Sequence, residues 1–328
     1  MELARRAWKL LPASVTESSV GSVARRTTLR ALRAEVPSEP RIIRTLDELE
    51  GAIAEWEQAV RVSDDALRSS FKTVRMQLDD VVFPADPFSD AYRMAVLDLY
   101  EWLHGGLYEV SNEMTPFEMQ AALAQPFPYL TSSPGVVGDY LIAIGHLVRT
   151  LDLGPGSRVL ELGAGWGNVA LPLARLGIEV TAVDVCPSFV ELIRARAERE
   201  GLQVETRLAD FSEIGELFGG ERPFDAVVFF ESFHHSADHN RLLRSLSTLV
   251  SRNGKLIFGA EPIERRFWQP WSLRLDGESL WAIRRNGWLE LGFRQDYFLE
   301  ALRRAGWGAQ LVACPATRWG QVWVSTRL

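Results

Sequence analysis

From residue 158 onward, short apolar runs alternate with amphipathic segments. The run "RVLEL" precedes the helical pattern "NVALPLARLG", and "EVTAVDV" precedes "PSFVELIRARAEREG". Further apolar runs follow at "QVETRLA", "FDAVVFFES" and "GKLIFGAE", with the helical patterns "DHNRLLRSLSTLV" and "QDYFLEALRRAGW" among the segments that come after them. Alternation of this kind requires crossover connections, so it predicts a mostly parallel sheet covered by helices on both faces.

The last two apolar runs, "AQLVACP" and "QVWVST", are joined only by "ATRWG". That link is too short for a crossover, so the two strands are expected to pair antiparallel. The sequence therefore predicts an α/β, Rossmann-like, doubly wound sheet of seven strands whose last strand is antiparallel.

The N-terminal part has a different pattern. Apolar residues recur at helical spacing from "TLDELEGAIAEWEQAV" to about Tyr108, and Thr45 with Glu48 forms a candidate capping box. We expect a basic flexible arm at 1–40, a helical region without strands at 41–130, and the α/β domain at 131–328. The helical region would serve as a cap or as the contact of a homodimer.

Composition limits the partners. The 328 residues carry a net charge of −7, which argues against nucleic-acid binding. Two cysteines exclude a disulfide framework and favour a cytoplasmic protein. No apolar run is long enough to span a membrane, so no transmembrane segment is expected. Because the first 34 residues are basic, a peripheral contact with the inner membrane stays open.

The turn after the first strand of the α/β pattern is rich in glycine. Gly163, Gly165 and Gly167 leave the backbone bare enough for a ligand to approach closely. Asp184 follows about 20 residues later, at the position where an acidic side chain binds ribose in such folds. This loop and this acid together predict a ligand that contains adenosine.

Two acidic residues distinguish the candidate ligands. Glu161 ends the first strand, where it would repel a pyrophosphate and attract a cation such as the sulfonium and ammonium of S-adenosylmethionine. Asp210, at the end of the third strand, could accept a hydrogen bond from the adenine amine. The predicted cofactor is therefore S-adenosylmethionine.

Residues 157–261 resemble class I S-adenosylmethionine-dependent methyltransferases in four ordered motifs, "VLELGAGWG", "AVDV", "LADF" and "FDAVVFFESFHH". The same chain resembles, less specifically, bacterial methyltransferases of polysaccharide or glycan biosynthesis in "DGESLWAIRR", "GWLELGF" and "PFPYLTSSPG". The first resemblance implies a methyltransferase sheet, and the second adds two residues that could close over the cofactor, Tyr129 and Thr131. The cofactor-binding residues expected in this way are Glu161, Gly163, Ala164, Gly165, Gly167, Asp184, Val185, Asp210, Phe211, Glu231, Tyr129 and Thr131.

Methyl transfer to oxygen is assisted by a base, and "ESFHHSADH" places two histidines just after the fourth strand. We expect His234 to be the base, because its register resembles that of the catalytic histidine of plant-type O-methyltransferases, with His235 as the second candidate. Glu261 ends the neighbouring strand and could orient the imidazole. His239 is expected to be structural. His235 and His239 with Asp238 and Glu261 could form a metal site, but no tight ligand spacing is present, so we expect no metal.

The segment 262–295 is an insertion rich in tryptophan and arginine, which suits a sugar, a glycan or an aromatic acceptor. The expected acceptor-binding residues are Trp268, Trp271, Arg274, Asp276, Glu278, Trp281 and Arg285. The alternative for this segment is a packed flap whose tryptophans belong to the core. The predicted function is O-methylation of a small molecule, most simply a sugar or glycan hydroxyl; C- or N-methylation, or a non-catalytic S-adenosylmethionine-binding scaffold, are the alternatives.

Overall fold

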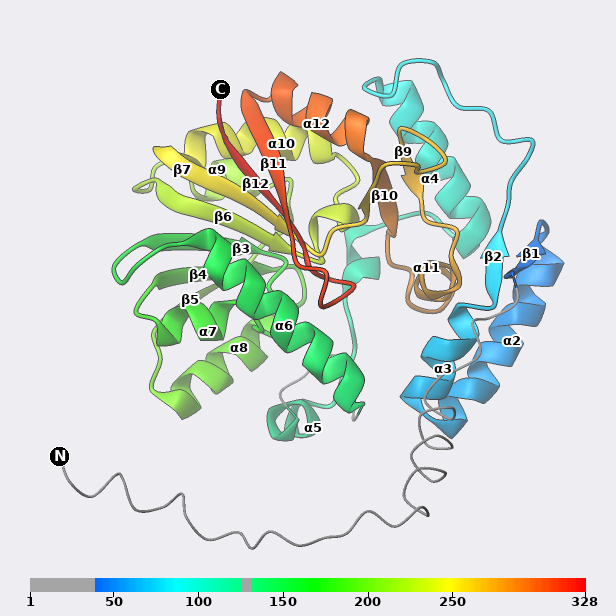
Figure 1. Cartoon of the computed structure of the whole chain (residues 1–328), viewed down its shortest axis with the longest axis horizontal. Helices are drawn as coiled ribbons and strands as arrows, with labels where there is room; N and C mark the ends of the chain where they lie inside the picture. Colours follow the sequence, from blue (N-terminus) through cyan, green and yellow to red (C-terminus); the bar gives the residue numbers. More distant parts are fainter. Residues whose placement is uncertain (1–38, 126–130, 132) are drawn as a thin grey trace, which may run out of the picture. The chain divides into compact units, whose positions relative to one another are not determined.

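A computed structural model describes residues 39–125, 131 and 133–328. Its main sheet has seven strands in the order β11–β12–β7–β6–β3–β4–β5, drawn in Figure 1. The strands are β3 (Arg158–Leu162), β4 (Glu179–Asp184), β5 (Val204–Leu208), β6 (Phe224–Phe230), β7 (Val250–Gly259), β11 (Trp307–Ala313) and β12 (Gln321–Arg327). Only β12 runs antiparallel to its neighbours, β7 and β11. The predicted doubly wound sheet is confirmed, and its winding reverses beside β3.

Two helical layers cover this sheet. On one face lie α6 (Pro134–Leu151), α7 (Ala170–Arg175) and α8 (Pro187–Glu200), which share a core with Val159, Val228 and other side chains of that face. On the opposite face lie α9 (Ile214–Leu217), α10 (His239–Leu249) and α12 (Gln295–Arg304), around side chains such as Leu160 and Phe258. Strand residues alternate between the two cores, as the pleat requires.

The N-terminal region is mainly helical, with α2 (Leu46–Val62), α3 (Asp64–Phe71), α4 (Asp90–His104), a 3-10 turn (Val110–Glu113) and α5 (Met119–Ala124). The Thr45–Glu48 capping box is present at the start of α2. The expectation of no strand here was wrong: β1 (Arg41–Ile43) and β2 (Val74–Met76) pair in parallel. Strands of three residues are too short to show a period of two, so the sequence pattern could not reveal them.

The insertion folds around a small sheet in the order β8–β10–β9, formed by β8 (Ile263–Glu264), β9 (Trp271–Leu273) and β10 (Leu291–Arg294). Between β9 and β10 lie α11 (Gly277–Trp281) and a π-helical turn (Ala282–Asn286). The N-terminal helices are tied to this insertion: the Tyr92 hydroxyl donates to the Trp271 carbonyl over 2.9 Å, and Arg68 pairs with Glu278. We call residues 41–104 and 262–294 together the cap.

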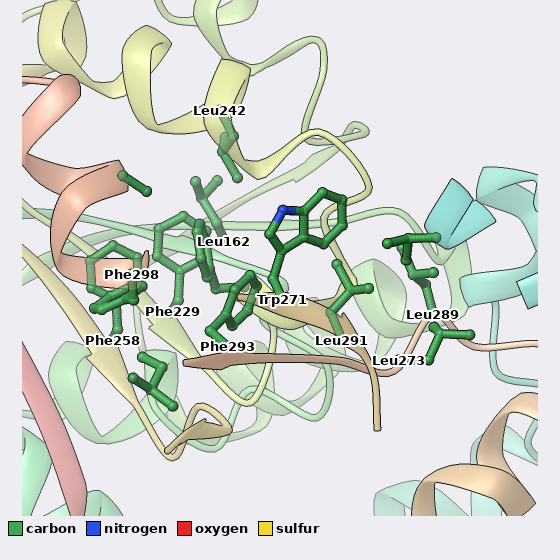
Figure 2. Close-up of a cluster of buried hydrophobic side chains, with 14 of the residues drawn as sticks. Leu162, Phe229, Leu242, Phe258, Trp271, Leu273, Leu289, Leu291, Phe293 and Phe298 are labelled. Atoms are coloured by element: carbon green, nitrogen blue, oxygen red, sulfur yellow. The ribbon is translucent and has the colours of Figure 1, made fainter. Parts of the chain in front are cut away.

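The cap and the main sheet share one hydrophobic core. Figure 2 shows Trp271, Leu273 and Leu291 of the insertion in the same cluster as Phe229 and Phe258 of the sheet. Trp271 is 2% exposed, and its indole N–H donates to the Pro87 carbonyl. Because its ring is buried in the core and its N–H is hydrogen-bonded inside the protein, this tryptophan anchors the insertion to the sheet. Over the residues that the structure describes, no helix has the length and apolar character needed to cross a membrane.

Candidate active site

A cavity opens beyond the carboxyl ends of β3, β4, β5 and β6, where a doubly wound sheet binds its ligand. Its wall contains nine of the residues expected to bind the cofactor: Glu161, Gly163, Ala164, Gly165, Asp184, Val185, Asp210, Phe211 and Glu231. Tyr108, Val110 and Thr115 also line it, and they come from the segment that precedes α5. We call this space the cofactor cavity.

The glycine loop adopts the backbone that its sequence requires. Gly163, Gly165 and Gly167 have φ of +73°, +49° and +74°, a region that side chains rarely permit. A Cβ on Gly163 would lie 2.5 Å from the Cβ of Ser232, so this glycine also allows the ends of β3 and β6 to approach each other. Gly167 lies outside the cavity wall, and a Cβ there would meet Ile193 of α8 at 3.0 Å.

Asp184 is oriented by the backbone of the loop that it faces. Its Oδ2 accepts the Gly165 N–H at 2.7 Å, and its Oδ1 accepts the Cys186 N–H at 2.8 Å. Burial raises the pKa of Asp184 to about 6, although these two N–H groups act in the opposite direction. A carboxylate has further lone pairs on both oxygens, so Asp184 can still accept hydroxyl groups from the cavity.

Glu161 places a buried acid at the floor of the cofactor cavity. Burial raises the pKa of Glu161 well above its usual range; the Ala170 N–H opposes that rise and Asp184 adds to it. Its Oε2 is buried and has no hydrogen-bond partner. An unsatisfied carboxylate oxygen is costly to bury, so this position favours a cationic or hydrogen-donating ligand group.

Two further residues, Tyr129 and Thr131, were also expected to bind the cofactor. Tyr129 falls outside the described residues. Thr131 is buried, but it is absent from the cofactor cavity wall, and its hydroxyl donates to Asp64 Oδ2 of α3 at 2.6 Å. Thr131 therefore ties the chain before α6 to the cap.

A second cavity of about 690 Å³ lies between the cap and the ends of β6 and β7. This volume is within the range of small-molecule sites. Three of the residues expected to bind the acceptor line it, namely Arg274, Glu278 and Trp281, as do His234, His235 and Glu261. We call this space the acceptor cavity.

The other four expected acceptor residues do not line either of the two cavities. Trp271 is in the core, and Trp268 packs against that core while its indole N–H donates to the Leu273 carbonyl. Asp276 caps α11 by accepting the Ser279 N–H, and it pairs with Arg274. Arg285 is exposed. Packing in the core accounts for Trp271 and Trp268, and helix capping accounts for Asp276. The abundance of tryptophan alone therefore did not show which tryptophans line the acceptor cavity and which belong to the core.

Several residues of the acceptor cavity were missed by sequence reasoning. Asp64 and Arg68 come from α3, and Arg318 and Trp319 come from the link between β11 and β12. Their local patterns resemble a solvated helix face and a short turn, so no local signal could have found them. Trp288 and Glu290 also line the cavity; they lie inside the tryptophan-rich insertion, which was a usable signal.

The two cavities meet. Glu231, His235 and Trp288 line both of them. Glu231 and Ala260 directly follow the neighbouring strands β6 and β7 and have φ of +52° and +57°. Non-glycine residues in this region are strained, and such strain concentrates at functional sites. The Tyr140 hydroxyl donates to Glu231 at 2.6 Å, while burial raises the pKa of Glu231 to about 7.

His234 and Glu261 form a buried pair beside this junction. Nδ1 of His234 lies 2.7 Å from Oε2 of Glu261, and the carboxylate also accepts the backbone N–H groups of Ser232, Phe233 and His234. Burial raises the pKa of Glu261, but His234 and these N–H groups outweigh it and hold the pKa below its usual value. The ionised carboxylate keeps the proton of His234 on Nδ1, so Nε2 carries the free lone pair.

His235 has a different environment. Its Nδ1 lies 3.1 Å from Glu113 Oε2. Burial lowers the pKa of His235, but Glu113, Glu290 and Glu261 together raise it to about 9. At neutral pH His235 is therefore mostly protonated, which suits charge stabilisation better than proton abstraction. His239 contacts Tyr297 through Nε2 at 2.8 Å and packs edge-on against Trp271, a structural position as expected.

Comparisons with known proteins agree with this geometry. A family model described as a methyltransferase domain matches residues 160–258. Over 124 residues the chain is 35% identical to a ubiquinone biosynthesis O-methyltransferase of Azorhizobium caulinodans, a match that covers 38% of this chain and 48% of that protein. Over 105 residues it is 41% identical to the protein of the same name from Methylocella silvestris, with 32% of this chain and 40% of that protein covered.

Each matched stretch thus spans less than half the length of those relatives. The fold is also similar to the crystal structure of an S-adenosylmethionine-dependent methyltransferase from Aquifex aeolicus, with a TM-score of 0.44 and 16% identity over 64% of this chain and 97% of that one. The family match lies on the strands that build the cofactor cavity. The chain therefore matches a methyltransferase domain over residues 160–258.

Proposed function

We propose that this protein is an enzyme that transfers a methyl group from S-adenosylmethionine to a hydroxyl group of a small molecule. The observation that carries the proposal is the junction of the cofactor and acceptor cavities at Glu231, His235 and Trp288. A cofactor and an acceptor bound in separate cavities can react only where those cavities meet. The buried His234–Glu261 pair lines the acceptor cavity beside that point.

The residues of the cofactor cavity fit the cofactor. The unpaired Oε2 of Glu161 suits its cationic methionine part, and the remaining lone pairs of Asp184 suit the ribose hydroxyls. The bare backbone at Gly163 and Gly165 leaves room between these acids. When bound, S-adenosylmethionine supplies a methyl group on a sulfonium, which is already reactive toward oxygen.

We assign proton removal to His234. Its Nδ1–H is held by Glu261, so its Nε2 can accept the proton of an acceptor hydroxyl as that oxygen is methylated. The ionised Glu261 stabilises the imidazolium that results. The positive charge of His235 stabilises negative charge that develops on the acceptor oxygen.

For the acceptor we propose a sugar or a glycan unit. The acceptor cavity carries three arginine–carboxylate pairs, Arg68–Glu278, Arg274–Glu290 and Arg318–Glu278. It also carries the flat faces of Trp281, Trp288 and Trp319. Hydrogen-bond donors on the arginines and acceptors on the carboxylates, beside apolar tryptophan faces, suit a neutral ring with many hydroxyl groups. Since the carboxylates are paired with arginines, an acceptor of high charge is disfavoured.

The relatives favour a second acceptor class. Both are named for O-methylation in ubiquinone biosynthesis, which points to an aromatic hydroxyl. The tryptophan faces of the acceptor cavity would accept an aromatic ring as well. The two classes differ in polarity, so one assay distinguishes them.

The test is an acceptor screen with methyl-labelled S-adenosylmethionine, using monosaccharides, nucleotide sugars, cell-envelope glycans and catechols. We expect labelled product with a sugar acceptor and its loss in His234→Ala, with His146→Ala as the matched control because His146 lies on α6 away from both cavities. NMR of the product identifies the methylated atom. Methylation at carbon or nitrogen would replace the O-methyltransferase assignment, and cofactor binding without turnover on any acceptor would indicate a scaffold.

A further inference from the structure

Three side chains with metal-binding chemistry converge where the two cavities meet. One ligand atom from each of His234, His235 and Glu290 lies within 4.8 Å of the other two. Nε2 of His234 is 3.8 Å from Oε2 of Glu290, and the two imidazole rings have centroids 4.2 Å apart. Two ligands of one transition metal ion are about 3.0–3.4 Å apart, because each bond is about 2.0–2.2 Å long. Small side-chain rotations therefore suffice to close the site around an ion.

Each of the two histidines has a carboxylate beside its Nδ1 atom. Glu261 lies at Nδ1 of His234, and Glu113 lies at Nδ1 of His235, over 2.7 and 3.1 Å. This leaves Nε2 of each ring for a ligand. Metal-binding histidines characteristically place their second nitrogen against a carboxylate, which fixes the ring and increases its basicity. Glu261 meets this description as a hydrogen-bond partner of His234, and Glu113 lies beside His235 within ion-pair distance.

The local charge also favours a cation. Glu113, Glu261 and Glu290 surround the two histidines, and Arg274 is paired with Glu290 over 3.1 Å. Glu290 is 7% exposed and pairs with that arginine. The His235–His239 alternative for a metal site does not form, because His239 is in the core against Tyr297 and Trp271.

We propose that His234, His235 and Glu290 bind one divalent transition metal ion at the junction of the cofactor and acceptor cavities. Two imidazoles and one carboxylate suit Zn²⁺, Co²⁺ or Ni²⁺ better than Mg²⁺ or Ca²⁺, which prefer oxygen ligands. Three protein ligands leave a coordination position for water or for an acceptor hydroxyl. The site was not visible in the sequence, because Glu290 comes from the insertion, far from the histidines along the chain.

The ion would occupy Nε2 of His234, the lone pair assigned above to the acceptor proton. On the proposed function, the metal-loaded protein therefore loses this base and transfers methyl groups more slowly. Metal binding itself does not depend on that assignment. If Zn²⁺ binds and the rate rises instead, the metal site stands and the base assignment is wrong.

The test uses the full chain, freed of metal with a chelator and then dialysed. Co²⁺ is titrated in and followed by its visible absorption, and Zn²⁺ binding is measured by calorimetry. We expect one ion per chain and absorption bands of histidine-ligated Co²⁺. His235→Ala and Glu290→Gln should each weaken binding by about 100-fold or more. Glu113→Gln, which removes only the orienting carboxylate, should weaken it about 10–100-fold.

The matched control is His146→Ala, whose imidazole contacts the Val312 carbonyl on another part of the molecule. It should bind Co²⁺ as the unchanged protein does. Circular dichroism and the urea midpoint of each variant show that the fold is retained. If one-to-one binding is absent in the unchanged protein, or if His235→Ala binds as tightly as His146→Ala, the proposal is overturned.

Discussion

Nδ1 of His234 and Oε2 of Glu261 lie 2.7 Å apart, although 27 residues separate them in the chain. They meet because β6 and β7 are neighbours in the sheet and end at the same edge. The Glu261 carboxylate also accepts three backbone N–H groups from residues 232–234. It thus fixes both the imidazole and the turn that carries it.

His234→Ala removes the proposed base while it leaves the cofactor cavity wall intact. We expect the methyl-transfer rate to fall about 10²–10⁴-fold with cofactor affinity little changed. Single-turnover kinetics and calorimetry with S-adenosylmethionine check the two parts. A normal rate in the His234→Ala/His235→Ala double variant would show that positioning alone carries catalysis.

Glu261→Gln should affect both rate and stability. Since both carboxylate oxygens accept N–H groups, an amide NH₂ at either position would face a donor. We expect a loss of about 1–3 kcal/mol in the free energy of unfolding as well as a slower reaction. Urea unfolding measures the first effect. An unchanged urea midpoint would contradict the hydrogen bonds described for this carboxylate.

The affinity for S-adenosylmethionine should increase with pH through about 6. The pKa of Asp184 is raised to about 6 in the folded protein without cofactor, and its ionised form is the better acceptor for ribose hydroxyls. Asp184→Asn should lose about 1.5–3 kcal/mol of binding free energy. It should also lose this part of the pH dependence, which calorimetry at a series of pH values measures. If Asp184→Asn retains the full pH dependence of affinity, that dependence belongs to another group, such as Glu161.

Glu231 should make stability depend on pH. Its pKa is about 7 in the folded protein and near the usual glutamate value of 4.5 when unfolded. A raised pKa means that the folded state binds the proton more tightly, so this contribution to stability is present below about pH 4.5 and is lost as the pH rises through about 7. Glu231→Gln should reduce the fall in stability across that window. The difference in urea midpoint between the two proteins, measured from pH 5 to about 8, tests this; a constant difference would contradict it.

Arg196 joins the cofactor loop to the C-terminal end of α5. Its guanidinium donates to the carbonyls of Trp166 and Ala122 at 2.6 Å and of Gln125 at 3.0 Å. Arg196→Met leaves these carbonyls without that donor, so we expect a loss of about 2–4 kcal/mol in the free energy of unfolding. Arg196→Lys keeps the charge but not the planar guanidinium with its several N–H donors, so it should lose less free energy of unfolding. Equal stability of the two variants would show that the planar geometry is unimportant.

The main sheet and the cofactor cavity could be predicted because their signals are local. The glycine loop, Asp184 and Asp210 each lie at or just after the carboxyl end of a strand, and parallel strands bring such positions to one edge. The acceptor cavity could be predicted only in part. Trp271 and Trp281 have similar neighbours in the sequence, yet one is in the core and the other lines the cavity. What separates them is packing against α4 and α3, which no local pattern encodes.

The cap joins two parts of the chain that are far apart in the sequence, residues 41–104 and 262–294. The hydroxyl of Tyr92 donates a hydrogen bond to the carbonyl of Trp271, 179 residues later in the chain. During synthesis, the apolar face of α4 therefore emerges long before the segment that buries it. The acceptor cavity can form only after its last wall residues, Arg318, Trp319 and Gln321, have been synthesised. A truncated or stalled nascent chain would expose this face to aggregation or to chaperones, even if its glycine loop had already folded.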